Sequence, residues 1–498
     1  MEFSENEYEE LIEELFSKHP SVQNAGFKAG AYKPGLDGMK EFDRSLGEPW
    51  RSYRTIHVAG TNGKGSVSSM LAAALSARGL RVGLYTSPHL LDFRERMKIV
   101  RGGKFEMPDK EFVWEFLHSG QTDGLSFFEI TTGMAFKWFE REKVDIAVIE
   151  TGLGGRLDST NIIRPELSIV TSIGLDHCAL LGDTRAKIAY EKAGIFKSGV
   201  PALVWGHDAE TSSVFEEVAG RVGSPLFFAD EMEPGVDENA LVEKLDLQAS
   251  CQRVNLHTVL CALRLLGSGS SGGCTQTGSS NSESGEEDRS AGACSGGILP
   301  EQLEAISRAA AITGLHGRWE ILRREPLVIA DIGHNPQALK LNFQRLEELA
   351  GGLQKASCIA GKCDTASCVA EDKHGSATAE NGNGSSGNTS NIVRERSGRQ
   401  ISIVYGVMAD KDLEGIAPFM PLNAKYYLCA PKTERSLEVE KLHHELGRMR
   451  PDLNLRACPS VAEAVGSALH DASPGSIIYI GGSTFVVAEA LVSNTLNH

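Results

Sequence analysis

Long apolar segments are missing from this sequence. No run of apolar residues among its 498 positions approaches the length that crosses a membrane. The acidic segment 1–16 lacks both the apolar core of a secretory signal and the arginines of a transit peptide. We therefore expect no membrane partner and a cytoplasmic location, with a mitochondrial address as the alternative if a transit segment precedes the sequence. The spacing of segment 1–16 predicts an amphipathic helix whose apolar face is formed by Leu11, Ile12, Leu15 and Phe16.

Basic residues are outnumbered by acidic ones. The chain has 50 Lys and Arg against 66 Asp and Glu, a formal net charge of -16 and a pI near 5.4. Nucleic-acid surfaces need clustered Lys and Arg to displace counterions, so we expect no nucleic-acid partner. Small anionic ligands remain compatible with this charge, because one lysine or one helix N-terminus can bind them locally.

Cysteine is too sparse for a disulfide framework. Ten cysteines are scattered through the 498 residues, which favours a reducing compartment. Two stretches, 267–297 and 364–400, also have few apolar residues, since they consist mostly of Gly, Ser, Thr, Asn and charged residues. Such segments cannot bury enough apolar surface to offset the entropy of ordering, so we predict two disordered insertions.

The remaining sequence alternates between strand-like and helix-like patterns. Near-continuous Val, Ile and Ala runs indicate strands that are covered on both faces, and hence an α/β fold with a mostly parallel sheet. We predict an ATP-binding domain at residues 1–266 and a smaller α/β domain at 298–498. The expected strands lie at 55–59, 81–86, 145–149, 167–173, 327–330, 401–404, 424–429 and 476–480.

The strongest local signal is the segment 55–66, TIHVAGTNGKGS. A strand leads into a glycine-rich turn, and a helical pattern begins at Val67. Glycines allow backbone N–H groups to approach phosphate oxygens, and Lys64 can neutralise the outer phosphates. The spacing departs from an ordinary P-loop, because Gly60 lies three positions before Gly63 and Gly65 separates Lys64 from Ser66. From the residues alone, the segment predicts phosphate binding.

Polar side chains follow two other predicted strands. Glu150 ends an apolar strand, as magnesium ligands do in α/β nucleotide enzymes, and it runs into the glycine-rich loop 151–161. Asp176 and His177 follow the strand at 167–173 in the same way. Because the carboxyl ends of parallel strands share one edge of a sheet, we expect these groups near the phosphate loop.

The second half of the chain carries a similar loop. A strand ends in Asp331 and is followed by Gly333, His334 and Asn335. Arg318, just before this strand, is a candidate cation that stabilises transferred phosphoryl charge across a cleft. A surface turn is an equally good reading of Arg318 by itself.

Together these motifs resemble the folylpolyglutamate synthase and dihydrofolate synthase family of the Mur ligase superfamily. The resemblance covers most of the chain outside the two insertions. It implies a P-loop-type domain like the central domain of Mur ligases, followed by a smaller Rossmann-like domain. The matching motifs, in order, are GTNGKGS, YTSPHL, FFEITT, ETGLGGRLDSTN, DH with LGDT, EKAGIFK, HGRWE and GHNP.

The resemblance implies a set of site residues. ATP contacts fall on Asn62, Gly63, Lys64, Gly65, Ser66, Asn255, Arg318 and Asp331. Magnesium ligands fall on Ser87, Glu150, His177 and Lys192. Two ions are expected, one of them held through Lys192 in carbamylated form. Contacts to the pterin-bearing substrate fall on Ser126, Phe127, Phe128, Glu129, Leu157, Asp158 and Ser159. The catalytic groups are expected to be Lys64, Lys192, Arg318 and His334.

The reaction that the resemblance implies uses ATP to phosphorylate a substrate carboxylate, and the amine of L-glutamate then attacks the acyl phosphate. Glu129 is similar to members that accept pteroate, so we favour dihydropteroate as the acceptor, with polyglutamate extension of folate as an additional activity. Exclusive folate extension is the alternative. We expect a monomer whose partners are these small molecules.

Two readings from other classes remain open. A P-loop phosphotransferase or NTPase would release or transfer phosphate without an amino acid. A non-catalytic nucleotide-binding module would release none.

Overall fold

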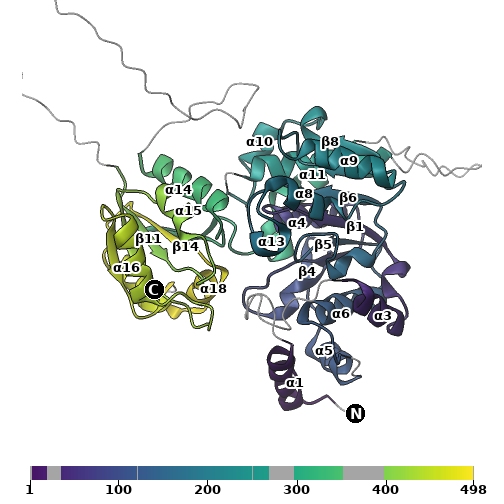
Figure 1. Cartoon of the computed structure of the whole chain (residues 1–498), viewed down its shortest axis with the longest axis horizontal. Coiled ribbons are helices and arrows are strands. Elements are labelled where there is room, and N and C mark those ends of the chain that lie inside the picture. The colour runs from purple at the N-terminus through teal and green to yellow at the C-terminus, as the bar shows by residue number, and fades with distance from the viewer. Residues whose placement is uncertain are drawn as a thin grey trace, which may run out of the picture.

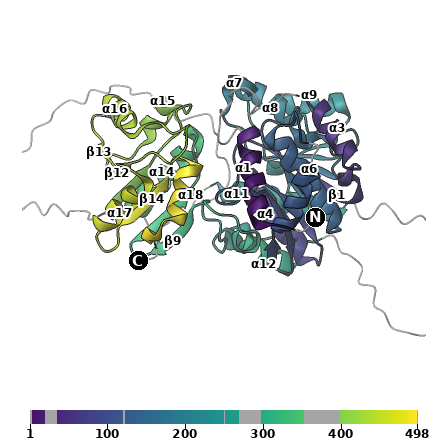
Figure 2. The same ribbon diagram turned by 90° about the horizontal axis from the view of Figure 1, so that it is seen from below.

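The protein contains two β-sheets (Figures 1 and 2). The first sheet with the helices packed on it is called the first unit, and the second sheet with its helices is called the second unit. The structure is a computed structural model that describes residues 3–19, 35–119, 122–249, 251–268, 297–351 and 398–496. Apart from their ends, both predicted insertions lie outside these residues. No helix in the described ranges is both long and apolar enough to cross a membrane.

The first sheet has eight strands in the order β4-β3-β2-β5-β1-β6-β7-β8. Strand β1 lies between β5 and β6 and is parallel to both. Only the pairs β2–β3 and β3–β4 are antiparallel, so β3 alone runs against the other strands. The bounds are β1 Arg54–Ala59, β2 Val82–Tyr85, β3 Met97–Arg101, β4 Lys104–Glu106, β5 Ile146–Glu150, β6 Leu167–Val170, β7 Ala202–Val204 and β8 Leu226–Phe228.

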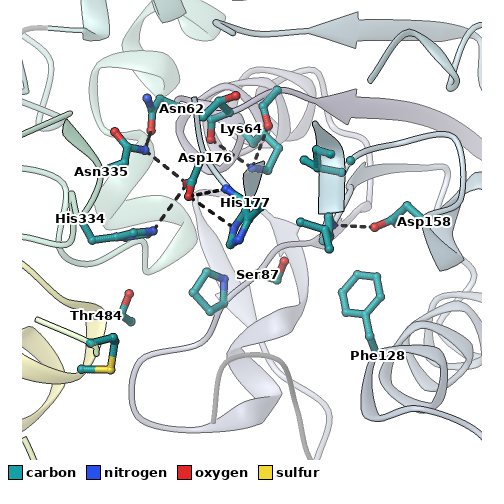
Figure 3. A pocket seen from close by; sticks show the side chains of 18 of the residues that line it. Asn62, Lys64, Ser87, Phe128, Asp158, Asp176, His177, His334, Asn335 and Thr484 are labelled. Carbon is teal, nitrogen blue, oxygen red and sulfur yellow. Dashed lines mark hydrogen bonds and ion pairs between the residues drawn. The ribbon is translucent and has the colours of Figure 1, made fainter. Parts of the chain in front are cut away.

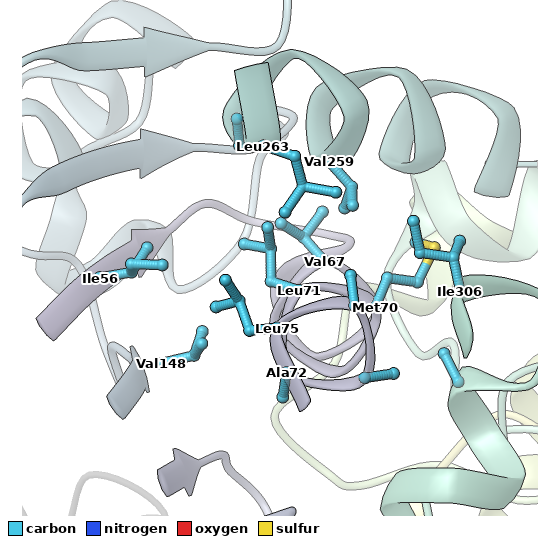
Figure 4. Packing of buried hydrophobic residues seen from close by; sticks show 14 of the residues in the cluster. Ile56, Val67, Met70, Leu71, Ala72, Leu75, Val148, Val259, Leu263 and Ile306 are labelled. Atoms are coloured by element: carbon cyan, nitrogen blue, oxygen red, sulfur yellow. The ribbon is translucent and has the colours of Figure 1, made fainter. Parts of the chain in front are cut away.

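Helix α4 (Lys64–Ala77) is the central helix of this unit. Nearly all of its residues are buried, because small Ala and Ser side chains let it lie between the sheet and a second helical layer. Figure 4 shows Leu71 and Leu75 of α4 packed toward Ile56 and Val148 of the strands. The other face of α4 contacts α11 (Gln252–Ser268), α12 (Pro300–Ser307) and α13 (Ala309–Thr313).

The remaining helices of the unit cover its other surfaces. The N-terminal helix α1 has the predicted face, since Leu15 is buried and Leu11, Ile12 and Phe16 pack against the aromatic cluster around α6. The bounds are α1 Glu5–Lys18, α3 Asp37–Ser45, α5 Lys110–His118, α6 Phe127–Arg141, α7 Cys178–Leu181, α8 Arg185–Ala193, α9 Ser212–Val222 and α10 Glu238–Val242, with short 3-10 turns η1 Pro49–Ser52, η2 Phe93–Arg96, η3 Ser159–Ile162 and η4 Ala229–Glu231.

The second sheet has six strands in the order β13-β12-β11-β14-β10-β9. All neighbours are parallel except β9 and β10. Helices α14 and α16 cover one face and α17 and α18 the other. The bounds are β9 Glu320–Arg324, β10 Leu327–Asp331, β11 Ile401–Tyr405, β12 Ala424–Leu428, β13 Asn454–Ala457, β14 Ile477–Gly481, α14 Pro336–Gly351, α15 Leu413–Ile416, α16 Val439–Met449, α17 Val461–His470, α18 Thr484–Val492, η6 Ala417–Phe419 and η7 Asn494–Leu496.

The predicted α/β fold with two parallel-dominated sheets is confirmed. Every strand expected from an apolar run is present, whereas short or half-exposed strands such as β4 and β9 were not predicted, because they lack such a run. The domain boundary at residue 298 stays a prediction. Helices α12 and α13, which follow it, pack on α4 of the first unit.

The carboxyl of Asp43 is buried outside the cavity, so it can be used to test how pH affects the stability of the fold. Its side chain is 3% exposed in α3 and accepts a hydrogen bond from Trp50 Nε1 at 3.0 Å. Burial raises the pKa of this carboxyl to about 6. The folded state therefore binds the proton more tightly than the unfolded chain, so stability falls as pH rises from about 4 through 6.

Asp43→Asn removes this cost. The variant is expected to be more stable than the unmodified chain at pH 8 by about 1 kcal/mol, and the advantage is expected to vanish near pH 4. Thermal unfolding at both pH values measures the difference. An equal loss of stability at both values would show that the amide fails to replace the carboxyl.

Candidate active site

A cavity of about 260 Å³ lies where the carboxyl ends of strands from both units face each other. In Figure 3, His334 and Asn335 of the second unit lie on one side, and Phe128 and Asp158 of the first unit lie on the other. The predicted residues that line it are Asn62, Lys64, Ser87, Ser126, Phe127, Phe128, Leu157, Asp158, Ser159, His177, Lys192 and His334.

The phosphate loop has the conformation that its glycines predict. Gly63 has φ 90° and directly precedes α4, and a Cβ there would lie 2.3 Å from Asn255 Oδ1. Only glycine fits this left-handed turn. The Lys64 ammonium donates to the carbonyl oxygens of Gly60 and Thr61 at 3.1 and 3.3 Å. Lys64 therefore lies folded over its own loop, beside the cavity.

A hydrogen-bonded layer supports the loop from below. Gln252 Nε2 donates to Ser66 Oγ at 3.1 Å, and Asn255 Nδ2 donates to Gln252 Oε1 at 2.9 Å. Ser66 is 1% exposed, and neither it nor Asn255 lines the cavity. Ser66 and Asn255, which were predicted to contact ATP, therefore lie next to the loop on the side away from the cavity. Gln252 was not predicted, because nothing in its local sequence distinguishes a helix-start glutamine.

Arg318 reaches the same region from the second half of the chain. A Cβ on Gly65 would lie at ordinary contact distance, 3.4 Å from its guanidinium and 3.7 Å from Glu150 Oε2, so both side chains lie next to Gly65. Asp331 is held by the protein itself, since its carboxylate accepts from the backbone N–H groups of Trp319 and Gly333 at 2.8 and 2.7 Å and from a side-chain amide. Neither residue lines the cavity.

Ser87 and His177 line the cavity, and Glu150 lies behind Ser87 without lining it. The Glu150 carboxylate accepts from the backbone N–H of Ser87 at 3.1 Å and lies 4.0 Å from the Lys64 ammonium. Burial raises the pKa of Glu150, and the Lys64 charge opposes the shift. Figure 3 shows the Ser87 hydroxyl near the His177 ring. Burial lowers the pKa of His177 to about 4, so its ring is neutral, as a metal ligand must be.

The donor set fits a hard divalent ion in part. Carboxylate and hydroxyl oxygens with one imidazole nitrogen are acceptable ligands for magnesium or manganese. Within the described ranges no three His, Cys, Asp or Glu side chains cluster as a metal site. The predicted set depends on a serine and a modified lysine, which lie outside those four types.

Lys192 is a buried amine beside the phosphate loop. It is 4% exposed on α8, and its ammonium donates to the carbonyl of Gly60 at 2.7 Å. Burial, with a contribution from the Lys64 charge, lowers its pKa to about 7. A large share of this amine is therefore neutral near pH 7, in contrast to an exposed lysine.

Two charged residues of the second unit, Lys411 and Arg435, also line the cavity and were not predicted. The Lys411 ammonium lies 3.5 Å from Asp176 of the first unit, and His334 Nε2 lies 3.9 Å from the same carboxylate. Burial alone would raise the pKa of Asp176, but His177, Lys411 and His334 together lower it. Arg435 also lines the cavity and pairs with Asp410 at 2.8 Å. The only sequence signal was the position of Lys411 shortly after a strand, where a charged residue is usually solvated.

The phosphate loop also contacts the second unit directly. Asn62 Oδ1 accepts from Asn335 Nδ2 at 2.9 Å, and Asn62 Nδ2 donates to Gln337 Oε1 at 3.2 Å. The two units therefore meet at a residue predicted to bind ATP.

Aromatic and apolar groups form the wall contributed by α6 and loop 151–161. Phe128 contacts Gly152 so closely that a Cβ there would lie 2.5 Å from its ring. Arg96, a buried cation that was not predicted, lines the cavity with its guanidinium 5.2 Å from the centre of the Phe127 ring. Glu129 does not line it, because its carboxylate accepts from Ser126 N and Oγ at 2.7 and 2.8 Å as the capping box of α6.

Comparison with known proteins identifies the family of this chain. Residues 58–268 match the model of the Mur ligase middle domain. The dihydrofolate synthase/folylpolyglutamate synthase of Escherichia coli is 30% identical over 447 residues, covering 87% of this chain and 85% of the relative. The chain belongs to the dihydrofolate synthase/folylpolyglutamate synthase family. Members of this family are ligases, so the predicted enzyme class is confirmed.

Two solved structures of the family align with nearly the whole chain. "E.coli FolC in complex with DHPP and ADP" has a TM-score of 0.69 and 26% identity, covering 97% of this chain and 96% of that one. A bifunctional folylpolyglutamate synthase/dihydrofolate synthase with Mn, AMPPNP and L-glutamate bound has a TM-score of 0.66 and 25% identity, covering 92% and 94%.

Proposed function

We propose that this enzyme joins L-glutamate to 7,8-dihydropteroate at the expense of ATP, and that it also extends folate with further glutamates. The observation that carries the proposal is the composition of the cavity, where a phosphate loop, a buried amine and an aromatic wall face cations of the second unit. Exclusive folate extension is the alternative. The expected monomeric state and cytoplasmic location stay predictions.

ATP binds with its phosphates on the loop 60–66. The free N–H groups at the start of α4 and the Lys64 ammonium provide the positive potential. ADP and AMPPNP in the related structures support this placement. Arg318 lies close enough to Gly65 to approach the same phosphates, whereas Asn255 and Ser66 hold the loop in shape.

Ser87, Glu150 and His177 would hold one magnesium ion, and carbamylated Lys192 would hold a second. Manganese in a related structure supports a divalent ion. Carbon dioxide adds only to a neutral amine, and the lowered pKa of Lys192 provides one next to Gly60. The carbamate converts a nitrogen base into anionic oxygen, which magnesium prefers. When bound, the ions neutralise charge on the phosphoryl oxygens.

The pteridine and glutamate occupy opposite ends of the cavity. Phe128 and the loop that carries Leu157 and Asp158 offer an aromatic face and polar edges for the pteridine. Lys411 is the best ligand for a glutamate carboxylate, because its ammonium faces the cavity from the second unit and lies 3.5 Å from Asp176, a looser pair than that of Arg435 with Asp410 at 2.8 Å.

Catalysis follows from positioning and electrostatics. A carboxylate oxygen of the acceptor attacks the γ-phosphorus, ADP leaves, and the glutamate amine displaces phosphate from the acyl phosphate with loss of a proton. Lys64 and Arg318 stabilise the charge as it moves from one phosphate oxygen to another. The contact of Asn62 with Asn335 and Gln337 joins the two units beside the phosphate loop, and keeping the units together there would limit access of water, which hydrolyses the intermediate.

Acceptor choice is tested with the purified enzyme. With ATP, magnesium and L-glutamate, it is expected to consume dihydropteroate and to release one phosphate for each amide formed. Turnover of tetrahydrofolate without any turnover of dihydropteroate would contradict the proposed acceptor.

Omission of glutamate separates the remaining classes. The ligase is expected to release phosphate only with both glutamate and the acceptor. A phosphotransferase or NTPase would release or transfer phosphate without glutamate, and a nucleotide-binding module would release none.

A further inference from the structure

A buried histidine lies beneath the loop that forms the pteridine end of the cavity. His57 is on β1, three residues before Gly60, and is 0% exposed. Its Nε2 lies 2.8 Å from Oγ1 of Thr160, which is also 0% exposed. Neither residue lines the cavity, and the reaction described above uses neither.

Thr160 connects His57 to Asp158, a residue of the cavity wall. Its backbone N–H and its hydroxyl both donate to Asp158 Oδ1, at 3.0 and 2.5 Å, and Asp158 Oδ2 accepts from Leu153 N at 2.8 Å. Both Asp158 and Leu153 line the cavity. A hydroxyl has one hydrogen, and here Asp158 receives it, so the Thr160 oxygen must accept from His57. The direction of the hydrogen bonds assigns the proton of His57 to Nε2.

The other ring nitrogen of His57, Nδ1, lowers the stability of the fold. Burial lowers the pKa of His57 to about 3, so the ring is neutral and its Nδ1 is a bare acceptor. That atom is buried and has no hydrogen-bond partner among the described residues. An unsatisfied buried acceptor destabilises a fold, so stability is a poor reason for a histidine in the centre of this sheet.

We propose that His57 and Thr160 are positioning residues that orient the Asp158 carboxylate and loop 152–159 for the pteridine. This inference rests on the proposed function. The strand that leads into the phosphate loop thereby also sets the geometry of the acceptor site. Loss of this hydrogen-bond relay from His57 through the Thr160 hydroxyl removes one of the bonds to Asp158 Oδ1 and leaves the carboxylate to backbone N–H groups, among them those of Thr160 and Leu153. The less firmly held carboxylate binds the acceptor more weakly, while the side chains that contact ATP and glutamate are unchanged.

A matched pair at Thr160 tests the relay. Thr160→Val keeps the shape but removes the hydroxyl, and it is expected to raise the KM for dihydropteroate about tenfold. The KM values for ATP and glutamate and kcat should change by less than about twofold. Thr160→Ser keeps the hydroxyl and is expected to behave like the unmodified enzyme.

Variants of His57 test the order of the relay. His57→Leu should raise the same KM, and His57→Gln, which can place an N–H near the Nε2 position, should restore it. Because the contacts act in series, His57→Leu combined with Thr160→Val should be no worse than Thr160→Val alone. If His57→Leu does not fold, the Thr160 pair decides by itself.

Several outcomes overturn the relay: an unchanged KM for the acceptor in Thr160→Val, an equal loss in every kinetic parameter, or additive effects in the double variant. If the unmodified enzyme uses only folate, the proposed acceptor is wrong, and the same ratios measured with folate still test the relay. Without any substrate, NMR of the ring nitrogens should find His57 protonated at Nε2 at pH 6. A ring protonated at Nδ1 would also overturn it.

Discussion

Lys192→Ala is expected to lower kcat at least about a thousandfold while leaving the fold intact. The side chain is buried and bonded to Gly60, and the proposed carbamate would supply an anionic oxygen ligand for a second ion at this position. Steady-state formation of the amide product measures the effect. Circular dichroism and thermal unfolding show whether the variant is folded.

Lys187→Ala is the matched control. Lys187 lies on the same helix, α8, but is exposed and pairs with Asp183 at 2.8 Å. Its loss should leave kcat unchanged. Mass spectrometry under carbon dioxide should find added mass at Lys192 and none at Lys187. Full activity of Lys192→Ala would eliminate the carbamate from the mechanism.

Lys411→Met is expected to raise the KM for L-glutamate roughly a hundredfold, with the KM for ATP nearly unchanged. Lys411 extends from the second unit into the cavity, 3.5 Å from Asp176, and methionine retains its length and apolar stem without the charge. Initial rates at varied glutamate, with ATP and acceptor saturating, measure the change.

Lys441→Met provides the comparison for this substitution. Lys441 is an exposed residue of α16 and takes no part in the cavity lining. The control should not change any kinetic parameter. An equal rise in the KM values for ATP and glutamate in Lys411→Met would indicate that the residue closes the two units and does not bind glutamate.

The conformation of the phosphate loop could be predicted from local sequence. Gly63 requires a left-handed backbone and Lys64 begins a helix, and both properties depend on residues within a few positions. Glu150 and His177 were predicted to lie near this loop because parallel strands end at one edge of a sheet. The structure brings both of them to the cavity region. Their roles as ligands stay predictions.

Other residues of the site depend on distant partners. Arg96, Lys411 and Arg435 line the cavity, yet each looks like an ordinary charged residue in its own segment. Conversely, Glu129 has a recognisable motif, but its carboxylate is occupied by Ser126 in a helix cap. A motif identifies a residue type at a spacing. Which atom then faces a substrate depends on contacts that are made only after folding.

The sequence by itself determined the α/β fold, the phosphate loop and the ligase family, because apolar runs, glycines and motif order are local properties of the chain. Only the tertiary structure decided which groups face one another. Lys192 has a lowered pKa because folding buries it beside Lys64, and the Thr160 hydroxyl that donates to Asp158 contacts His57, about a hundred positions earlier in the chain. Burial and electrostatic coupling act through space, so no pattern along the chain contains them.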